Sequence, residues 1–169
     1  MLFRSAEYLR RLATEANGHF QELKAAHPGK PCEALRAWLG EMADHIANGD
    51  DRGCALTNAA VELPEKEHPA RCVIEEHKNA QRDQLIELCR EAKLAALEEL
   101  TRTKGLTPSE TLAVGDGAND LAMIKEAGLG VAFHAKPAVA AVAAARVDHC
   151  DLTALLFAQG YRRAEFTPP

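Results

Sequence analysis

Residues 111–133 have the sequence TLAVGDGANDLAMIKEAGLGVAF, in which two short apolar runs flank a polar turn and a helix-like stretch. The runs at 111–115 and 128–133 have the length and composition of buried strands, and residues 119–128 between them have helical spacing. A third possible strand lies at 145–149, and further helix-like stretches separate and follow these strands. Strands that alternate with helices predict a parallel sheet with right-handed crossovers.

The chain before residue 104 has a different pattern, because its apolar residues recur at helical spacing and no strand is expected there. Turn-forming groups rich in Gly, Pro, Asn and Asp interrupt this pattern. They predict helices at 4–25, 32–47, 53–62 and 68–103. The predicted fold is therefore mainly helical, with an all-α part at 1–92 before an α/β part at 93–169 that holds a partial Rossmann-like parallel sheet of about three strands.

The last of these predicted helices carries two apolar stripes, and the second is turned from the first by roughly 110° at about 100° per residue. The first stripe consists of Leu85, Leu88 and Ala92, and the second of Leu94, Leu97 and Leu100. Either one helix serves two hydrophobic cores, or a long helix contacts different neighbours along its length. The spacing alone favours neither interpretation.

The composition excludes several classes of function. The chain has 20 Lys and Arg against 25 Asp and Glu, a net charge of -5 and no basic cluster, so no nucleic-acid binding is expected. No apolar run is long enough for a signal peptide or a membrane span, so we expect a soluble, cytoplasmic chain without a membrane partner. The five scattered cysteines form no metal-binding pattern and are expected to be reduced thiols.

The strongest candidate site is the turn GDGAND at 115–120, directly after the first predicted strand. Asp116 and Asp120 stand four residues apart, with the amide of Asn119 between them, at the carboxyl end of a parallel strand where open α/β sheets bind ligands. Hard oxygen ligands there suit Mg²⁺, which takes one or two carboxylates, water and substrate phosphate. The same residues are also typical of an ordinary tight turn, in which Asn119 would cap the next helix.

The run GDGANDLAMIKEAGLGVAFHAKP, followed by DLTALLFAQGY and RRAEF, resembles the carboxyl-terminal part of bacterial phosphoserine phosphatases of the haloacid dehalogenase superfamily over residues 93–166. The resemblance implies a hydrolase of serine biosynthesis, with Mg²⁺ as cofactor and phosphate or a phosphoserine-like small molecule as ligand. It implies Asp116 as a direct metal ligand, with Asn119 and Asp120 supporting the metal and its waters. It also implies that Lys93, 23 positions before Asp116, neutralises the charge of the phosphate and the nucleophile.

The nucleophile of this family has no counterpart in the chain. The reaction needs an aspartate nucleophile and, two residues later, an aspartate that acts as acid and base, but no Asp-x-Asp occurs in the sequence. No nucleophile is therefore assigned, and the chain alone is expected to lack phosphoserine phosphatase activity. The absent nucleophile strand would leave an exposed edge at 111–114, which predicts weak stability or self-association. His134 and Lys136, in a loop similar to the family's loop beside the site, are assigned no catalytic role.

Residues 3–92 resemble a second family, the TetR-type transcriptional repressors, in their carboxyl-terminal ligand-binding and dimerisation region. The resemblance lies in EALRAWLGEMADHI, DDRGCALTNAAVEL and the long predicted helix from residue 68. It implies a homodimer through the helical part and a site for an apolar effector, whereas no DNA binding is expected because no recognition helix is present. The candidate lining residues are Trp38, Met42, Leu56 and Leu63. Core packing is the commoner role for apolar residues at this spacing.

Three interpretations of function therefore remain open. The first is a metal-binding and phosphate-binding half domain of phosphoserine phosphatase type, with Lys93, Asp116, Asn119 and Asp120 as its site. The second is a dimerising, effector-binding module. The third is a fusion of two gene fragments that meet near residue 92, in which neither ancestral activity survives.

Overall fold

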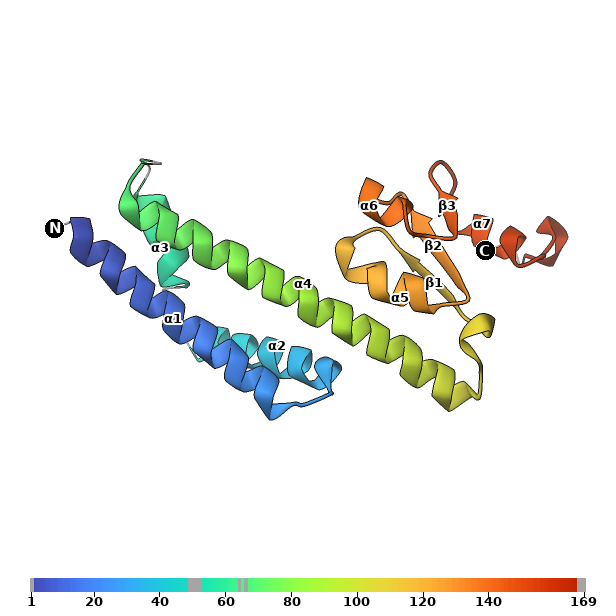
Figure 1. The fold of residues 1–169 in the computed structure, drawn as a ribbon, viewed down its shortest axis with the longest axis horizontal. Helices are drawn as coiled ribbons and strands as arrows, with labels where there is room; N and C mark the ends of the chain where they lie inside the picture. Colours follow the sequence, from blue (N-terminus) through green and yellow to red (C-terminus); the bar gives the residue numbers. More distant parts are fainter. Residues whose placement is uncertain (1, 49–52, 64, 66, 167–169) are drawn as a thin grey trace. The chain divides into compact units, whose positions relative to one another are not determined.

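The structure is a computed structural model that describes residues 2–48, 53–63, 65 and 67–166 (Figure 1). The chain divides into two compact units, Met1–Ala92 and Lys93–Pro169. The first is called the helical unit below and the second the α/β unit. None of the described helices is long and apolar enough to cross a membrane.

The described residues of the helical unit form four helices, as predicted. They are α1 (Leu2–Ala26), α2 (Pro31–Ala47), α3 (Ala55–Glu62) and the first part of α4 (Pro69–Lys104). Each helix begins and ends within two residues of its predicted bounds. Proline opens both α2 and α4, where its missing N–H group costs no hydrogen bond and its fixed φ suits the helix. Gly29, at a φ of 68° in the turn before α2, adopts a backbone conformation that other residues rarely do.

Two small hydrophobic cores hold these helices together. One lies where α1 and α3 meet the start of α4, and its buried residues are Ala6, Leu9, Leu56, Ala70, Val73 and Ile74. The other lies between α1, α2 and the middle of α4, and its buried residues are Phe20, Leu23, Ala34 and Leu88. Leu88 is fully buried in this second core. The apolar residues that recur at helical spacing thus include the residues that are buried in the two cores.

The α/β unit contains three parallel strands in the order β1-β2-β3, which confirms the predicted sheet. The strands are β1 (Leu112–Gly115), β2 (Leu129–Phe133) and β3 (Ala145–Val147). The helices of this unit are α5 (Leu121–Glu126), α6 (Pro137–Ala140) and α7 (Thr153–Ala158), with single 3₁₀ turns at η1 (Pro108–Glu110), η2 (Ala118–Asp120) and η3 (Arg163–Glu165). Of the helix-like stretch expected between β2 and β3 only α6 forms a helix, and residues 141–144 connect it to β3.

Glycine at position 130 allows α5 to pack directly on β2. A Cβ atom on Gly130 would lie 2.1 Å from the backbone oxygen of Ile124, a separation that real atoms do not reach. The side chain of Ile124 then joins Ala132 and Val139 in the core of this unit. Close packing of helix on strand therefore depends on a residue without a side chain.

In the described part of the chain one edge of the sheet has no strand partner, and the end of α4 is only partly buried. Within the described residues β1 pairs with β2 alone, so its other edge has no strand partner, and the expected self-association through that edge stays a prediction. On α4, Leu94 and Leu97 are half-buried, whereas Leu100 is 60% exposed. The second stripe of this helix is thus only partly covered.

Substitution of Gly130 by alanine should destabilise the α/β unit, because the new methyl group meets backbone rather than a movable side chain. We expect the free energy of unfolding to fall by about 1–3 kcal/mol or more, as in other overpacked cores. Urea unfolding followed by circular dichroism measures the change. Gly40→Ala is the matched control, because its Cβ position in α2 has no atom within 4 Å apart from the backbone of its own helix and the adjacent residues. That variant should be stabilised by about 0.5–1 kcal/mol, and equal effects of the two substitutions would contradict the packing argument.

Candidate functional site

The loop between β1 and α5 is organised by the buried side chain of Asp120. One carboxylate oxygen, Oδ2, accepts hydrogen bonds from the backbone N–H groups of Asp116 (3.0 Å) and Gly117 (3.1 Å). Asp120 is only 2% exposed. A Cβ atom on Gly115 would lie 2.3 Å from the Cβ of Asp120, so the carboxylate can occupy this position only beside a glycine. Gly115 thus ends β1 against this carboxylate, and Gly117 lies in the bend that follows.

Lys93 engages the second oxygen of the same carboxylate. Its Nζ lies 2.5 Å from Oδ1 of Asp120, although the two residues are 27 positions apart in the sequence. The lysine side chain is 41% exposed and the aspartate side chain 3% exposed. The ammonium group is thus fixed at the rim of the loop by a buried carboxylate, with part of its surface open to solvent.

These contacts change the ionisation of Asp120. Burial by itself would raise the pKa of the carboxyl group, but the hydrogen bonds from Lys93, Gly117 and Asp116 and the lysine's charge together hold the pKa below its ordinary value. Asp120 is therefore ionised at neutral pH. Since the folded-state pKa is the lower one, this interaction stabilises the fold fully above about pH 4 and is lost as the pH falls through the folded-state pKa.

Asp116 and Asn119 carry the oxygens of the loop that remain available. The side chain of Asp116 is exposed and that of Asn119 is half-buried. Within the described part of the chain neither side chain makes a hydrogen bond or ion pair. The side-chain oxygen of Asn119 lies over the loop, 2.8 Å from where a Cβ of Gly117 would be. The loop therefore offers one free carboxylate and one free amide oxygen.

This donor set fits a partly hydrated Mg²⁺ ion. No group of three or more His, Cys, Asp and Glu residues among the described ranges is placed to hold a metal, so an all-protein cage is not formed there. Mg²⁺ does not need one, because it commonly keeps several waters and takes one or two carboxylates together with phosphate oxygens. Asp116 meets that requirement directly, whereas both oxygens of Asp120 are already engaged.

The four residues predicted for the site thus lie in one place, but one local prediction is wrong. Asn119 does not cap the following helix, because it lies inside the 3₁₀ turn η2 and α5 begins only at Leu121. Asp120 occupies the capping position and makes no side-chain capping bond to α5, since its carboxylate is used by Lys93 and the loop. Residue spacing could not reveal which of the two aspartates would be buried.

The loop after β2 lies against the candidate site. The backbone N–H of Lys136 donates a hydrogen bond to the backbone oxygen of Asp116 (3.1 Å). His134 has a φ of 45°, uncommon for a residue other than glycine, and its ring Nε2 is 3.1 Å from the backbone oxygen of Cys150. The side chains of His134 and Lys136 are both exposed. The backbone of this loop therefore supports the Asp116 turn.

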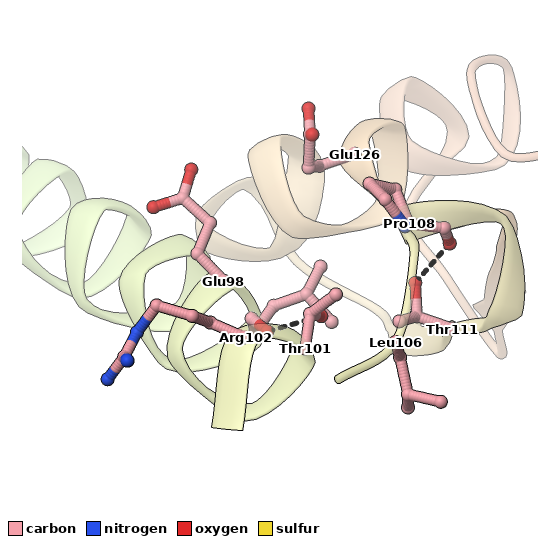
Figure 2. A pocket seen from close by; sticks show the side chains of 8 residues that line it. Glu98, Thr101, Arg102, Leu106, Pro108, Thr111 and Glu126 are labelled. Atoms are coloured by element: carbon pink, nitrogen blue, oxygen red, sulfur yellow. Dashed lines mark hydrogen bonds between the residues drawn. The ribbon is translucent and has the colours of Figure 1, made fainter. Parts of the chain in front are cut away.

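A hollow in the α/β unit lies at the start of β1, whereas the candidate site follows the end of that strand. Its volume is about 260 Å³, and Figure 2 shows the carboxylates of Glu98 and Glu126 projecting from α4 and α5 beside it. The hydroxyl of Thr101 donates to a backbone oxygen of α4, and that of Thr111 donates to the oxygen of Pro108. These two hydroxyls are therefore already used, and the carboxylates beside the hollow come from α4 and α5 and not from the loop after β1.

Comparison with known families agrees with this fold and loop. The sequence profile of the haloacid dehalogenase-like hydrolases matches residues 54–152, more than half of the chain. The chain belongs to this family. The match begins in the helical unit at Cys54 and extends beyond β3 of the α/β unit.

The individual relatives are phosphoserine phosphatases, and they match the carboxyl-terminal region. The enzyme of Haemophilus influenzae is 53% identical over 64 residues, which cover 38% of this chain and 20% of that protein. Phosphoserine phosphatase SerB2 of Mycobacterium tuberculosis is 46% identical over 76 residues, which cover 45% of this chain and 19% of that protein. A solved phosphoserine phosphatase in its apo form is 41% identical, with a TM-score of 0.39, over 40% of this chain and 34% of that one. The chain thus spans only about a fifth of the length of the two curated relatives.

Substitution of Lys93 by methionine should destabilise the protein at pH 7, because it leaves the buried carboxylate of Asp120 without its cation. Removing one partner of a buried pair costs several kcal/mol, and the partial exposure of Lys93 reduces the expected loss to about 1–2 kcal/mol. The difference from wild type should shrink as the pH falls below about 4, through the lowered pKa of Asp120. Urea unfolding at several pH values measures both effects.

The matched control is Lys125→Met, which removes an exposed lysine from the last turn of α5. Its loss of stability should be small and independent of pH in this range. Equal losses for Lys93→Met and Lys125→Met at pH 7 would show that the ion pair to Asp120 contributes nothing specific.

Proposed function

We propose that the α/β unit binds Mg²⁺ and a phosphorylated small molecule at the loop after β1, as a half site of phosphoserine phosphatase type. The observation that carries this proposal is the arrangement of Lys93, Asp120 and Asp116. A buried carboxylate positions a half-exposed ammonium group, and on the same loop lies an exposed carboxylate that has no partner among the described residues. A cation next to a free metal ligand is the combination that phosphate and Mg²⁺ need.

Each residue of the site has a distinct role in this proposal. Asp116 holds Mg²⁺ directly, Asn119 supports it through its amide oxygen or a water, and Asp120 keeps the loop closed around the site. When bound, Mg²⁺ supplies charge stabilisation to phosphate oxygens. Lys93 donates to the phosphate from its exposed side and, like the metal, offsets its negative charge. The half-site holds a phosphate group in place without attacking it.

Hydrolysis is a separate step, for which this chain lacks a group at the required spacing. Covalent phosphoryl transfer needs a carboxylate nucleophile positioned opposite the leaving oxygen, with an acid to protonate that oxygen. The sequence has eight aspartates, and no two of them are separated by one residue. We therefore propose that the chain by itself binds phosphate without turning over a phosphate ester.

A first test concerns metal binding. Mg²⁺ titrated into the purified chain in a calorimeter, with inorganic phosphate present, should give a saturable signal that Asp116→Ala abolishes or weakens at least tenfold. The reason is that Asp116 supplies the only direct carboxylate ligand in this arrangement. Asp83→Ala is the control, because it removes an exposed aspartate from the helical unit and should leave the binding unchanged.

Equal Mg²⁺ affinities for Asp116→Ala and wild type would refute the metal site. Binding that survives Asp116→Ala but is lost in Asn119→Ala would also contradict the roles assigned here, because the amide is placed as a supporting group.

A second test concerns turnover. Phosphoserine incubated with the chain and Mg²⁺ should release no inorganic phosphate above the buffer rate, and Asp116→Ala should behave in the same way. Phosphate release by wild type that disappears in Asp116→Ala would mean that a carboxylate outside any Asp-x-Asp motif, or one from a second subunit, acts as nucleophile. That result would overturn the proposal of an inactive half site while supporting its metal position.

The helical unit supports a second candidate function. A mainly apolar hollow of about 490 Å³ lies in this unit, and its walls include Trp38 and Met42. Two other residues considered as lining, Leu56 and Leu63, instead pack in the core formed by α1, α3 and α4. The hollow favours a dimerising, effector-binding module of the TetR type, with an apolar ligand as its effector. This candidate would leave the α/β unit without a function of its own, as would a fusion of two gene fragments.

A further inference from the structure

The backbone of the loop after β2 is fixed at both ends. The N–H of His134 donates to the backbone oxygen of Val147 in β3 (2.9 Å), and the N–H of Lys136 donates to that of Asp116 (3.1 Å). Between them Ala135 is half-buried and packs on the core of the α/β unit. The loop thus holds its main chain in place while the side chains on either side of Ala135 are exposed.

The main chain of Lys136 is held beside the candidate site. Besides its bond to Asp116, this residue is the N-cap of α6, and its backbone oxygen accepts from the N–H groups of Val139 (2.9 Å) and Ala140 (3.0 Å). In turn α6 lies against η2, the 3₁₀ turn of the loop between β1 and α5. Three hydrogen bonds therefore fix the point from which the lysine side chain starts.

The side chain of Lys136 is exposed, and within the described chain its ammonium group has no hydrogen bond or ion pair. Arginines of the same unit differ, since Arg102 pairs with Glu99 and Arg146 with Asp148. Solvated lysines are common on protein surfaces, but this one starts from a backbone bonded to the proposed metal-binding residue. A flexible four-carbon stem lets its charge follow a ligand from that fixed point.

The conformation of His134 is a second observation that concerns the same loop. Its φ is 45°, in the left-handed region that residues other than glycine seldom adopt. Its ring meets the ring of Phe133 edge to face, and its Nε2 lies 3.1 Å from the backbone oxygen of Cys150. Backbone outliers of this kind are concentrated at ligand-binding sites, where the surrounding structure holds them. Here the bend leads the chain from the end of β2 to its contact with Asp116.

The charges at the site leave a place for one more cation. Asp116 and Asp120 contribute two negative charges, whereas Lys93 and a bound Mg²⁺ contribute three positive ones. The excess of one positive charge does not balance a phosphate monoester, which carries about −1.5 to −2 at pH 7. The basic residue whose backbone is bonded to this loop is Lys136. Its charge would complete the balance.

We propose that Lys136 is a second phosphate-binding cation of this site, whose ammonium group donates to an oxygen of a phosphate held by Mg²⁺ at Asp116. The inference rests on the function proposed above and extends it to a residue outside the loop between β1 and α5. It also defines the class of ligand. Two lysines, two aspartates and Mg²⁺ balance a doubly charged phosphate group, whereas a singly charged phosphodiester would leave one positive charge uncompensated.

Calorimetric titration of inorganic phosphate into the full chain, at saturating Mg²⁺ and mildly alkaline pH, tests the proposal. Lys136→Met should raise the dissociation constant of phosphate roughly tenfold, because a hydrogen bond between charged groups is lost. It should not weaken Mg²⁺ binding measured without phosphate. The matched control is Lys125→Met, which removes an exposed lysine from the last turn of α5 and should leave phosphate binding unchanged. Circular dichroism should show both variants folded, since the backbone of residue 136 makes its hydrogen bonds without the side chain.

The remaining outcomes separate this inference from the proposed function. Phosphate binding as tight in Lys136→Met as in wild type overturns the inference, while loss of Mg²⁺ binding in Asp116→Ala would still support the metal site. A Lys136→Met chain that loses affinity for phosphoserine but not for inorganic phosphate also overturns it, because the lysine would then contact the rest of the ligand. Dimethyl phosphate that binds wild type as tightly as inorganic phosphate contradicts the ligand class. Wild type that binds neither Mg²⁺ nor phosphate overturns the proposed function and this inference together.

Discussion

The candidate site depends on a single buried carboxylate, that of Asp120, and on the three donors that surround it. One oxygen holds the ammonium group of Lys93, and the other holds the two N–H groups of the turn. A carboxylate taken out of water without such partners would cost several kcal/mol, so the turn, the lysine and the end of β1 must form together. Gly115 belongs to the same constraint, because any side chain there would displace the carboxylate. The composition of GDGAND is thus explained by packing as much as by chemistry.

The elements of the fold could be predicted from the sequence because their patterns are long and regular. The helical spacing before residue 104 and the two apolar runs at 111–133 indicate four helices and parallel strands. The position of the site could also be predicted, since polar residues after a parallel strand gather at its carboxyl end. Which of Asp116 and Asp120 would be buried could not be predicted. Both are aspartates of one short motif, and only the three-dimensional turn determines that one carboxylate is buried and the other exposed.

In the helical unit the sequence was less informative about what each apolar residue does. Trp38, Met42, Leu56 and Leu63 all fit a helical pattern, but only the first two line a hollow and the other two are core. Periodicity identifies the apolar face of a helix and does not say what that face meets. The family match begins at Cys54, inside this unit, so the similarity to haloacid dehalogenase-like hydrolases is not confined to the α/β unit. The likeness of residues 3–92 to TetR-type regulators stays a prediction.

The hydrogen bonds from the backbone of Asp116 and Gly117 to a buried carboxylate also affect how this loop exchanges its protons with water. Loop amides usually exchange quickly, because they open without disturbing the rest of a fold. These two amides can exchange only when the Asp120 side chain leaves its position, and that requires the start of α5 and the Lys93 contact to give way as well. The amide hydrogens of this surface loop should therefore be retained as long as those of the strand that precedes it. The residues proposed to bind a ligand then lie in a turn that is as rigid as a protein core.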